Sequence, residues 1–235
     1  MHRESRARFR NIELPDPESA KQETEVRFVI NTIPGEILNG ICEGAYPCEL
    51  VFQSYFKIVN EDGTTDKTRL RKITSTDGTT RYFFTQKKGE GVTRMESEVE
   101  VPRSKKILEL EEKSRHRSLE KIRIHIPLGN WYDSERVIEL DVFLGELRGL
   151  VIAEVEFKGE KSDLQAKDFG ENHPEWFGTN VTGVDPLGNA KLAKFGIPED
   201  ARELEGWHRV DISKIETAIA KLIASATVEP LRKAA

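Results

Sequence analysis

Seven short stretches of the chain carry charged or polar side chains at every second position, and this alternation limits the possible folds more than any other feature. Successive side chains of a β-strand point to opposite faces, so each stretch would form a strand with one apolar and one ionic face. In one of them Lys121, Arg123 and His125 alternate with Ile122 and Ile124. The alternation therefore predicts a mainly β protein.

The ionic positions allow two interpretations. The remaining ones are Glu23, Glu25 and Arg27; Arg69 and Arg71; Thr85 and Lys87; Arg94, Glu96 and Glu98; Glu139 and Asp141; and Glu154 and Glu156. An antiparallel sheet with one solvated face is the commonest origin of such a pattern, and it would make the chain a plain β scaffold. However, like charges placed side by side repel unless opposite charges lie between them. We therefore favour a closed antiparallel barrel of about eight strands, with a charged interior and helices covering its apolar outside.

Composition limits the class of protein. The chain has 235 residues, with 36 Lys and Arg against 41 Asp and Glu, which gives a net charge of -5. This balance argues against a nucleic-acid partner. No apolar run reaches the length of about 20 residues that a membrane-spanning helix needs, and the charged N-terminus does not resemble a signal peptide. We expect a cytoplasmic protein, without a membrane partner, in which Cys42 and Cys48 are reduced.

The order of elements predicts one α+β domain. Residues 1–20 carry few large apolar groups and are predicted to be a flexible arm, and residues 21–235 to be a single domain that includes a C-terminal helix. We expect helices within 33–45, 105–119 and 212–223, strands at 23–30, 50–59, 120–127, 135–144 and 149–158, and turns at 60–63 and 77–78. The stretch beyond residue 158, with Pro174, Pro186 and Pro198, is less regular.

Several motifs together resemble the CYTH domain of the triphosphate tunnel metalloenzymes. The segment Glu23-Thr24-Glu25-Val26-Arg27-Phe28 is similar to the E-x-E-x-K motif of that family. In family order follow Gln53-Ser54-Tyr55-Phe56, Arg69-Leu70-Arg71, Thr85-Gln86-Lys87, Arg94-Met95-Glu96-Ser97-Glu98, Lys121-Ile122-Arg123, Ile138 to Phe143, Gly149 to Phe157 and Pro174 to Gly178. The matches span about Glu23 to Leu192, and the family's fold is an eight-stranded antiparallel tunnel, as the alternation predicts.

The resemblance also implies a site and a reaction. Metal ligands for Mg²⁺ or Mn²⁺ would be Glu23, Glu25, Glu154 and Glu156, with Asp141 nearby, because carboxylate oxygens suit these cations. Phosphate oxygens would be held by Arg69, Arg71, Lys87, Arg94, Lys121 and Arg123. Catalytic roles would fall to Arg27, Lys87 and Lys121. Glu96 and Glu98 would either orient the basic side chains, which we favour, or reach a metal. A water oriented by the metal would attack the terminal phosphorus without a covalent intermediate.

The substrate is open at this stage. The resemblance favours a metal-dependent hydrolase of inorganic triphosphate, acting on a small molecule as a monomer or homodimer. Thiamine triphosphatase and a class IV-type adenylate cyclase are alternatives of the same fold, and a non-catalytic polyphosphate-binding module is an alternative of another class. The chain departs from the family at Arg27, where the motif has Lys, at Asn180, where Glu is usual, and at Leu187, where Tyr is frequent.

Overall fold

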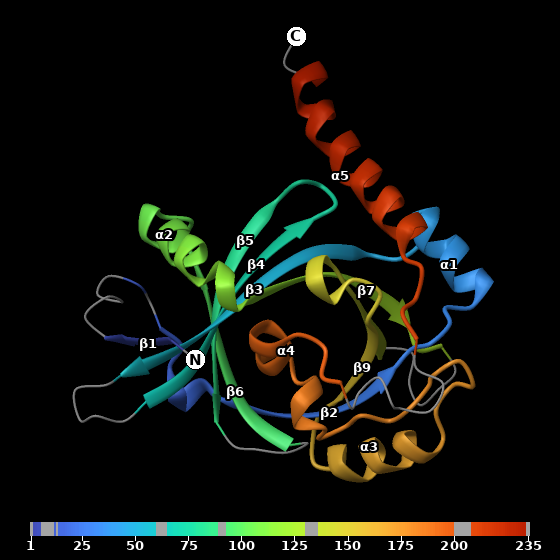
Figure 1. The fold of residues 1–235 in the computed structure, drawn as a ribbon, viewed down its shortest axis with the longest axis horizontal. Helices are drawn as coiled ribbons and strands as arrows, with labels where there is room; N and C mark the ends of the chain where they lie inside the picture. Colours follow the sequence, from blue (N-terminus) through green and yellow to red (C-terminus); the bar gives the residue numbers. More distant parts are fainter. Residues whose placement is uncertain are drawn as a thin grey trace.

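The centre of the molecule is a closed β-barrel of eight antiparallel strands (Figure 1). The computed structural model describes residues 2–5, 12, 14–59, 65–88, 93–129, 136–199 and 208–233. The barrel strands are β2 (Lys21–Val29), β3 (Cys48–Val59), β4 (Thr65–Ser75), β5 (Thr80–Lys88), β6 (Thr93–Val101), β7 (Ser118–Pro127), β8 (Val137–Phe143) and β9 (Val151–Phe157). They pair in the order β3-β4-β5-β6-β2-β9-β8-β7, and β7 closes the ring on β3. The predicted barrel is confirmed.

A ninth strand lies outside the ring. Strand β1 (His2–Ser5) pairs in parallel with the end of β3, and η2 (Pro17–Ser19) is a short 3-10 helix just before β2. Both fall within residues 1–20, so part of this segment has regular structure. The extent of a flexible arm and the single domain over residues 21–235 stay predictions.

Helices cover the apolar outside of the barrel. Their bounds are α1 (Gly35–Cys42), α2 (Lys105–Ser114), α3 (Ser162–Glu171), α4 (Asn189–Phe195) and α5 (Ser213–Lys233). The outward side chains of β2, β7, β8 and β9 pack with Ile41 of α1, Phe169 of α3 and Ile215 of α5 in the largest core. A second core lies between β3, β4, β5 and α2, around Phe84 and Leu110. Removing this apolar surface from water is the main force that holds helices on the barrel.

A third cluster forms an apolar floor across one end of the barrel. Four strands contribute to it from the inner face, through Val29, Leu119, Phe143 and Ile152. Leu187 of η5 (Asp185–Leu187) and Leu192 of α4 cover these side chains, and α4 lies across the barrel opening in Figure 1. The floor therefore separates the ionic part of the interior from this end of the molecule.

Most predicted elements are found, with bounds shifted by a few residues. The helix predicted at 105–119 ends at Ser114, and η3 (Arg115–Arg117) leads directly into β7. The turn at Asp77 and Gly78 is present, with Gly78 at a positive φ of 82°, whereas the turn predicted at 60–63 lies outside the described residues. Cys42 and Cys48 are free thiols. In the part of the chain that the structure describes, no helix is long and apolar enough to cross a bilayer.

The sequence reading missed α3, η5 and α4. Helix α3 gives a weak pattern because only Ser162, Ala166 and Phe169 of its ten residues are buried, while Leu164 is 70% exposed. Helix α4 is only seven residues long, and Leu192 is its one buried residue. Neither helix offers the wide apolar stripe by which an amphipathic helix is recognised.

Candidate active site

The strand register places all the predicted site residues on the inner face of the barrel. Directly paired residues of antiparallel neighbours share a face, as do residues two apart on one strand. The pairs that establish this are Glu23 with Arg94, Glu25 with Glu156, Arg27 with Glu154, Arg123 with Asp141, Arg69 with Thr85, Thr85 with Glu98, and Lys87 with Glu96. Lys87 and Arg94 are placed by this register alone. The sequence therefore predicted the membership of the ionic face.

Arg123 is the centre of the ionic network. Its Nε and Nη2 donate to the two oxygens of Asp141 at 2.7 and 2.8 Å, and Nη2 also lies 2.7 Å from Glu154 Oε2. Its Nη1 forms an ion pair with Glu139. One guanidinium thus holds three carboxylates from β8 and β9, in the forked geometry that arginine favours.

Arg27 joins this network from β2. Its Nε donates to Glu154 Oε1 at 2.9 Å, so that both oxygens of Glu154 are bound by arginine. Its Nη2 donates to the carbonyl oxygen of Leu187 at 3.2 Å, in the segment that covers the barrel end. Two departures from the family motifs, Arg27 and Leu187, are therefore in direct contact.

A second group of ion pairs lies on β4, β5 and β6. Glu98 Oε2 is 2.6 Å from Arg71 Nη2 and 3.5 Å from Arg69 Nη2, and Thr85 donates a short hydrogen bond to the same oxygen. The Nε atoms of Arg69 and Arg71 are buried, and neither has a hydrogen-bond partner among the described residues. Each of these arginines therefore has a donor to offer to an anion.

Among the interior cations whose side chains the structure describes, Lys121 is the most enclosed. Its side chain is 2% exposed, and its ammonium contacts Asp141 and lies 5.7 Å from the centre of the Phe143 ring. Burial, together with the nearby charge of Arg123, lowers the pKa of Lys121 to about 8. This lysine can therefore gain or lose a proton near neutral pH.

Carboxylates gather on β2, β8 and β9. Glu25 and Glu156 are paired neighbours, and Glu139 is paired with Glu154 on the next strand. Burial, followed by the charges of Glu139 and Glu25, raises the pKa of Glu156. Among the described residues, no three His, Cys, Asp or Glu side chains converge into a set that could hold a metal ion.

Strand β3 adds inner residues that the sequence reading did not select. Gln53 and Tyr55 pair with Arg71 and Arg69, and Gln53 Nε2 donates to the Tyr55 hydroxyl at 2.8 Å. Burial raises the pKa of Tyr55, so its phenol stays protonated. Alternation within the predicted strand at 50–59 could have identified both residues. Neither residue carries a charge, so the pattern of alternating charges does not indicate them.

Another addition from β3 lies close to His125. Glu49 Oε2 is 3.6 Å from His125 Nε2, and this polar contact with the histidine lowers the pKa of Glu49. His125 lies farther from the apolar floor than Lys121 and Arg123 on the same strand, as expected of a residue that lines the entrance.

Comparison with known proteins shows which proteins this chain is similar to. No model of a protein family matches the chain. Over 113 residues, or 48% of its length, the chain is 31% identical to the inorganic triphosphatase of Acetivibrio thermocellus. The closed eight-stranded antiparallel barrel agrees with the tunnel fold of the CYTH domain that the sequence motifs resemble. The match spans 65% of the length of that relative, which is just under two thirds.

Two solved structures are similar to this tunnel fold. The crystal structure of the inorganic triphosphatase NE1496 has a TM-score of 0.48 and 28% identity, and the alignment covers 73% of this chain and 94% of that one. The structure of the PH1819 protein from Pyrococcus horikoshii OT3 has a TM-score of 0.42 and 20% identity, over 64% of this chain and 85% of that one.

The chemistry of the tunnel interior follows from its internal pairing. Cations and carboxylates neutralise one another across the inner face, so a lone anion or a lone cation would have to break ion pairs without replacing both partners. An anion that arrives with metal cations can take both roles at once. The arginines would then exchange their carboxylate partners for oxygens of the anion. The carboxylates would exchange their arginine partners for the metal cations.

Proposed function

We propose that the protein is a metal-dependent hydrolase that converts inorganic triphosphate into diphosphate and orthophosphate. The observation that carries the proposal is an enclosed inner face built from both signs of charge, with Arg27, Lys121 and Arg123 against Asp141 and Glu154. Inorganic triphosphate needs only such an ionic surface. The proposed activity agrees with that of the relative from Acetivibrio thermocellus.

Phosphate binding is assigned first to Arg69 and Arg71. Their buried Nε donors lack partners in the described part of the chain, and donors left unsatisfied in a protein interior favour an anion strongly. Lys121 and Arg123 would add positive charge once their carboxylate partners are drawn away. Lys87 and Arg94 complete the proposed set of phosphate ligands from their inner positions on β5 and β6.

Glu23, Glu25, Glu154 and Glu156, with Asp141, are the proposed ligands of Mg²⁺ or Mn²⁺. The carboxylates present fit a hard cation, because Glu25 and Glu156 lie side by side and Glu156 Oε1 is buried with no hydrogen-bond partner among the described residues. When bound, one or two such ions would neutralise the phosphate charge and orient the attacking water.

The protein side chains would then position the substrate and balance charge as the bond breaks. Glu98 holds Arg71, and Glu96 lies 4.0 Å from Arg69, which fits a supporting role for both carboxylates. Lys121 would stabilise the leaving oxygens as an ammonium, and its lowered pKa allows it to donate a proton to them. Arg27 is a poor proton acceptor, so its part in catalysis would be to hold Glu154 in place.

Orthophosphate release tests the proposal. The substrates would be inorganic triphosphate, ATP and thiamine triphosphate, each with Mg²⁺ or Mn²⁺ and with a chelator as control. We expect metal-dependent release that is fastest with inorganic triphosphate and is lowered about a hundredfold or more in Arg69→Ala. Arg148→Ala is the matched control, because the Arg148 side chain is 44% exposed and pairs with Glu216.

Other results would point to other functions. Formation of cyclic AMP from ATP would indicate a cyclase, and fastest release from thiamine triphosphate would indicate a thiamine triphosphatase. Tight binding of triphosphate with no release under any metal condition would contradict the proposed reaction and favour a polyphosphate-binding module.

A further inference from the structure

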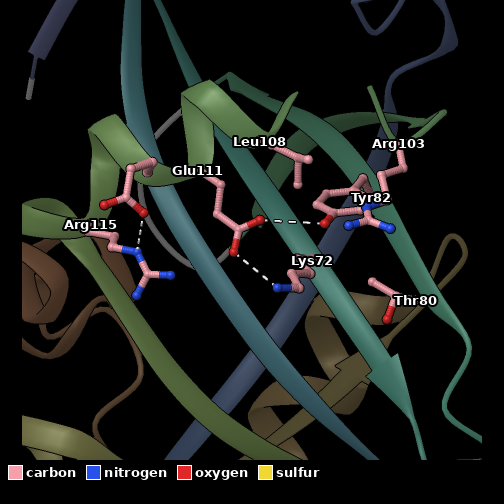
Figure 2. A pocket seen from close by; sticks show the side chains of 8 residues that line it. Lys72, Thr80, Tyr82, Arg103, Leu108, Glu111 and Arg115 are labelled. Atoms are coloured by element: carbon pink, nitrogen blue, oxygen red, sulfur yellow. Dashed lines mark hydrogen bonds and ion pairs between the residues drawn. The ribbon is translucent and has the colours of Figure 1, made fainter. Parts of the chain in front are cut away.

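A pocket of about 390 Å³ lies outside the barrel, between α2 and the outer face of β4 and β5 (Figure 2). Lys72 and Tyr82 line it from these strands, next to Arg71 and Phe83, which are on the inner face. Side chains of adjacent strand residues point to opposite faces. The pocket is therefore separate from the tunnel interior and is not explained by the proposed hydrolysis.

Helix α2 and its neighbours build one wall of the pocket. Leu108, Glu111 and Glu112 of α2 and Arg115 of η3 line it, and their spacing of three and four residues places them on one helical face. Ser104 accepts a hydrogen bond from the backbone N–H of Ile107 and so fixes the start of the helix. The wall is thus part of a regular element with a defined N-cap.

A buried carboxylate anchors the opposite walls to each other. Glu111 is 7% exposed. It accepts a 3.0 Å bond from Lys72 Nζ and a 3.4 Å hydrogen bond from the Tyr82 hydroxyl (Figure 2). These contacts join α2 to β4 and β5 across the pocket, so the cavity has a preformed shape rather than a shape imposed by a ligand.

Three cations and two carboxylates line the pocket, so one cation has no counter-charge. Glu111 is neutralised by Lys72, and Glu112 pairs with Arg115 at 2.8 Å. Arg103, on the link between β6 and α2, has no ion pair or hydrogen bond with any residue that the structure describes. A guanidinium free to make forked bonds is suited to a carboxylate or a phosphate group.

Apolar surface lies beside this cation. Leu108 is 37% exposed although it lines a concave site. In Figure 2, Leu108, the Tyr82 ring and the Arg103 guanidinium lie on one side of the pocket. A cavity of this size can hold a small molecule, and its mostly charged lining includes two apolar surfaces, Leu108 and the Tyr82 ring.

We propose that this pocket binds a small organic anion, with one carboxylate or phosphate group on Arg103 and an apolar body against Leu108 and Tyr82. The ligand class is set by the single unpaired cation and the adjacent apolar side chain. The site neither requires the proposed triphosphatase activity nor shares a side chain with it.

Methyl NMR of the full chain tests the site. Leucine methyl groups would be labelled, and the Leu108 signals would be assigned from their loss in Leu108→Ile. The probes are benzoate and phenyl phosphate, with benzyl alcohol as the neutral analogue. We expect saturable shifts of the Leu108 methyls with a Kd of about 1 mM for at least one anion, weakened about tenfold in Arg103→Ala and largely retained in Arg103→Lys.

Two control variants separate this site from its surroundings. Lys105→Ala removes an exposed cation of α2 that does not line the pocket, and it should leave the Kd unchanged. Arg69→Ala disables the tunnel interior, so unchanged Leu108 shifts there would show that the two sites are independent. The proposal is overturned if benzyl alcohol shifts Leu108 as strongly as the anions, if Arg103→Ala binds as well as wild type, or if no saturable shift occurs.

Discussion

At the scale of single residues, Arg27 links β2, β9 and the segment over the barrel end. Its guanidinium binds Glu154 and the Leu187 carbonyl in a setting where the arginine and glutamate side chains are only 8% and 10% exposed. We expect Arg27→Ala to lower the free energy of unfolding by about 3 kcal/mol, because a buried carboxylate loses a partner. Urea denaturation would measure this change.

The matched control for Arg27 is the surface pair of Arg148 and Glu216. Both side chains are at least one third exposed, and their closest atoms are 2.7 Å apart. Arg148→Ala should change the free energy of unfolding far less than Arg27→Ala does, because water screens exposed ion pairs. Equal losses in the two variants would mean that the Arg27 contacts do not stabilise the fold beyond an ordinary surface pair.

Lys121 predicts a pH dependence of stability. Its pKa is about 8 in the folded protein against an ordinary value of 10.5, so between these values the unfolded chain binds a proton that the folded chain does not. Stability should therefore rise with pH across this window, by up to about 1 kcal/mol per pH unit. The gain in stability from deprotonation of Lys121 is complete above pH 10.5 and is lost as the pH falls through 8.

Comparison with Lys121→Met would isolate this effect. Methionine is similar in volume and does not titrate, so the variant should lack this part of the slope when urea midpoints are compared without metal at several pH values. If wild type and variant depend on pH in parallel, the titration of Lys121 is not coupled to folding.

The sequence predicts which residues share a face of the sheet, but not which of them form ion pairs. Alternation placed Glu25, Lys121 and Glu154 on one face because that inference needs only the period of a strand. It could not predict that Arg123 holds three carboxylates, or that Glu98 holds Arg71, since these pairings depend on the register between strands distant in sequence. Which of these residues bind metal or phosphate stays a prediction.

At the scale of elements, η5 and α4 form the cover of the apolar floor. Leu192 is 2% exposed and packs with the inner side chains of four barrel strands. Leu192→Ala should lower the free energy of unfolding by about 3 kcal/mol through lost burial and a new cavity. Leu164→Ala on α3 is the control, because Leu164 is 70% exposed and should cost under about 0.5 kcal/mol.

Thermal or urea denaturation would compare the two leucine variants. A small loss in Leu192→Ala, similar to that of Leu164→Ala, would mean that α4 does not pack firmly on the barrel. The sequence reading missed α4 for a related reason. With one buried residue in seven, the helix owes its position to contacts with the floor rather than to an apolar stripe of its own.

At the scale of the whole molecule, closure of the barrel makes the interior a single system of balanced charge. Its overall form was predictable because seven strands repeat the same pattern, whereas the pairing of β1 was not, since four residues carry too little pattern. Balanced pairing predicts that Mn²⁺ and a triphosphate stabilise the protein cooperatively. Mn²⁺ alone would leave the displaced arginines without a counter-charge, and triphosphate alone would leave the displaced carboxylates without one. The two ligands together would give both groups new partners.

Differential scanning calorimetry can measure this coupling with Mn²⁺ and the non-hydrolysable imidotriphosphate. The increase in Tm with both ligands should exceed the sum of the increases with each alone. Arg148→Ala should retain the excess, and the double variant Arg69→Ala and Arg71→Ala should lose it. Strictly additive shifts in the wild type would contradict balanced exchange of ion pairs.

The apolar floor makes the barrel a dead end for a phosphate chain. Val29, Leu119, Phe143 and Ile152 offer no hydrogen-bond partner to a charged group, so phosphate units cannot continue past them. In the proposed reaction, substrate would enter and product would leave by the same opening, so each product would have to leave before the next substrate arrives. A long polyphosphate could enter the barrel only by its terminus. It would therefore be shortened from that end and not cleaved internally.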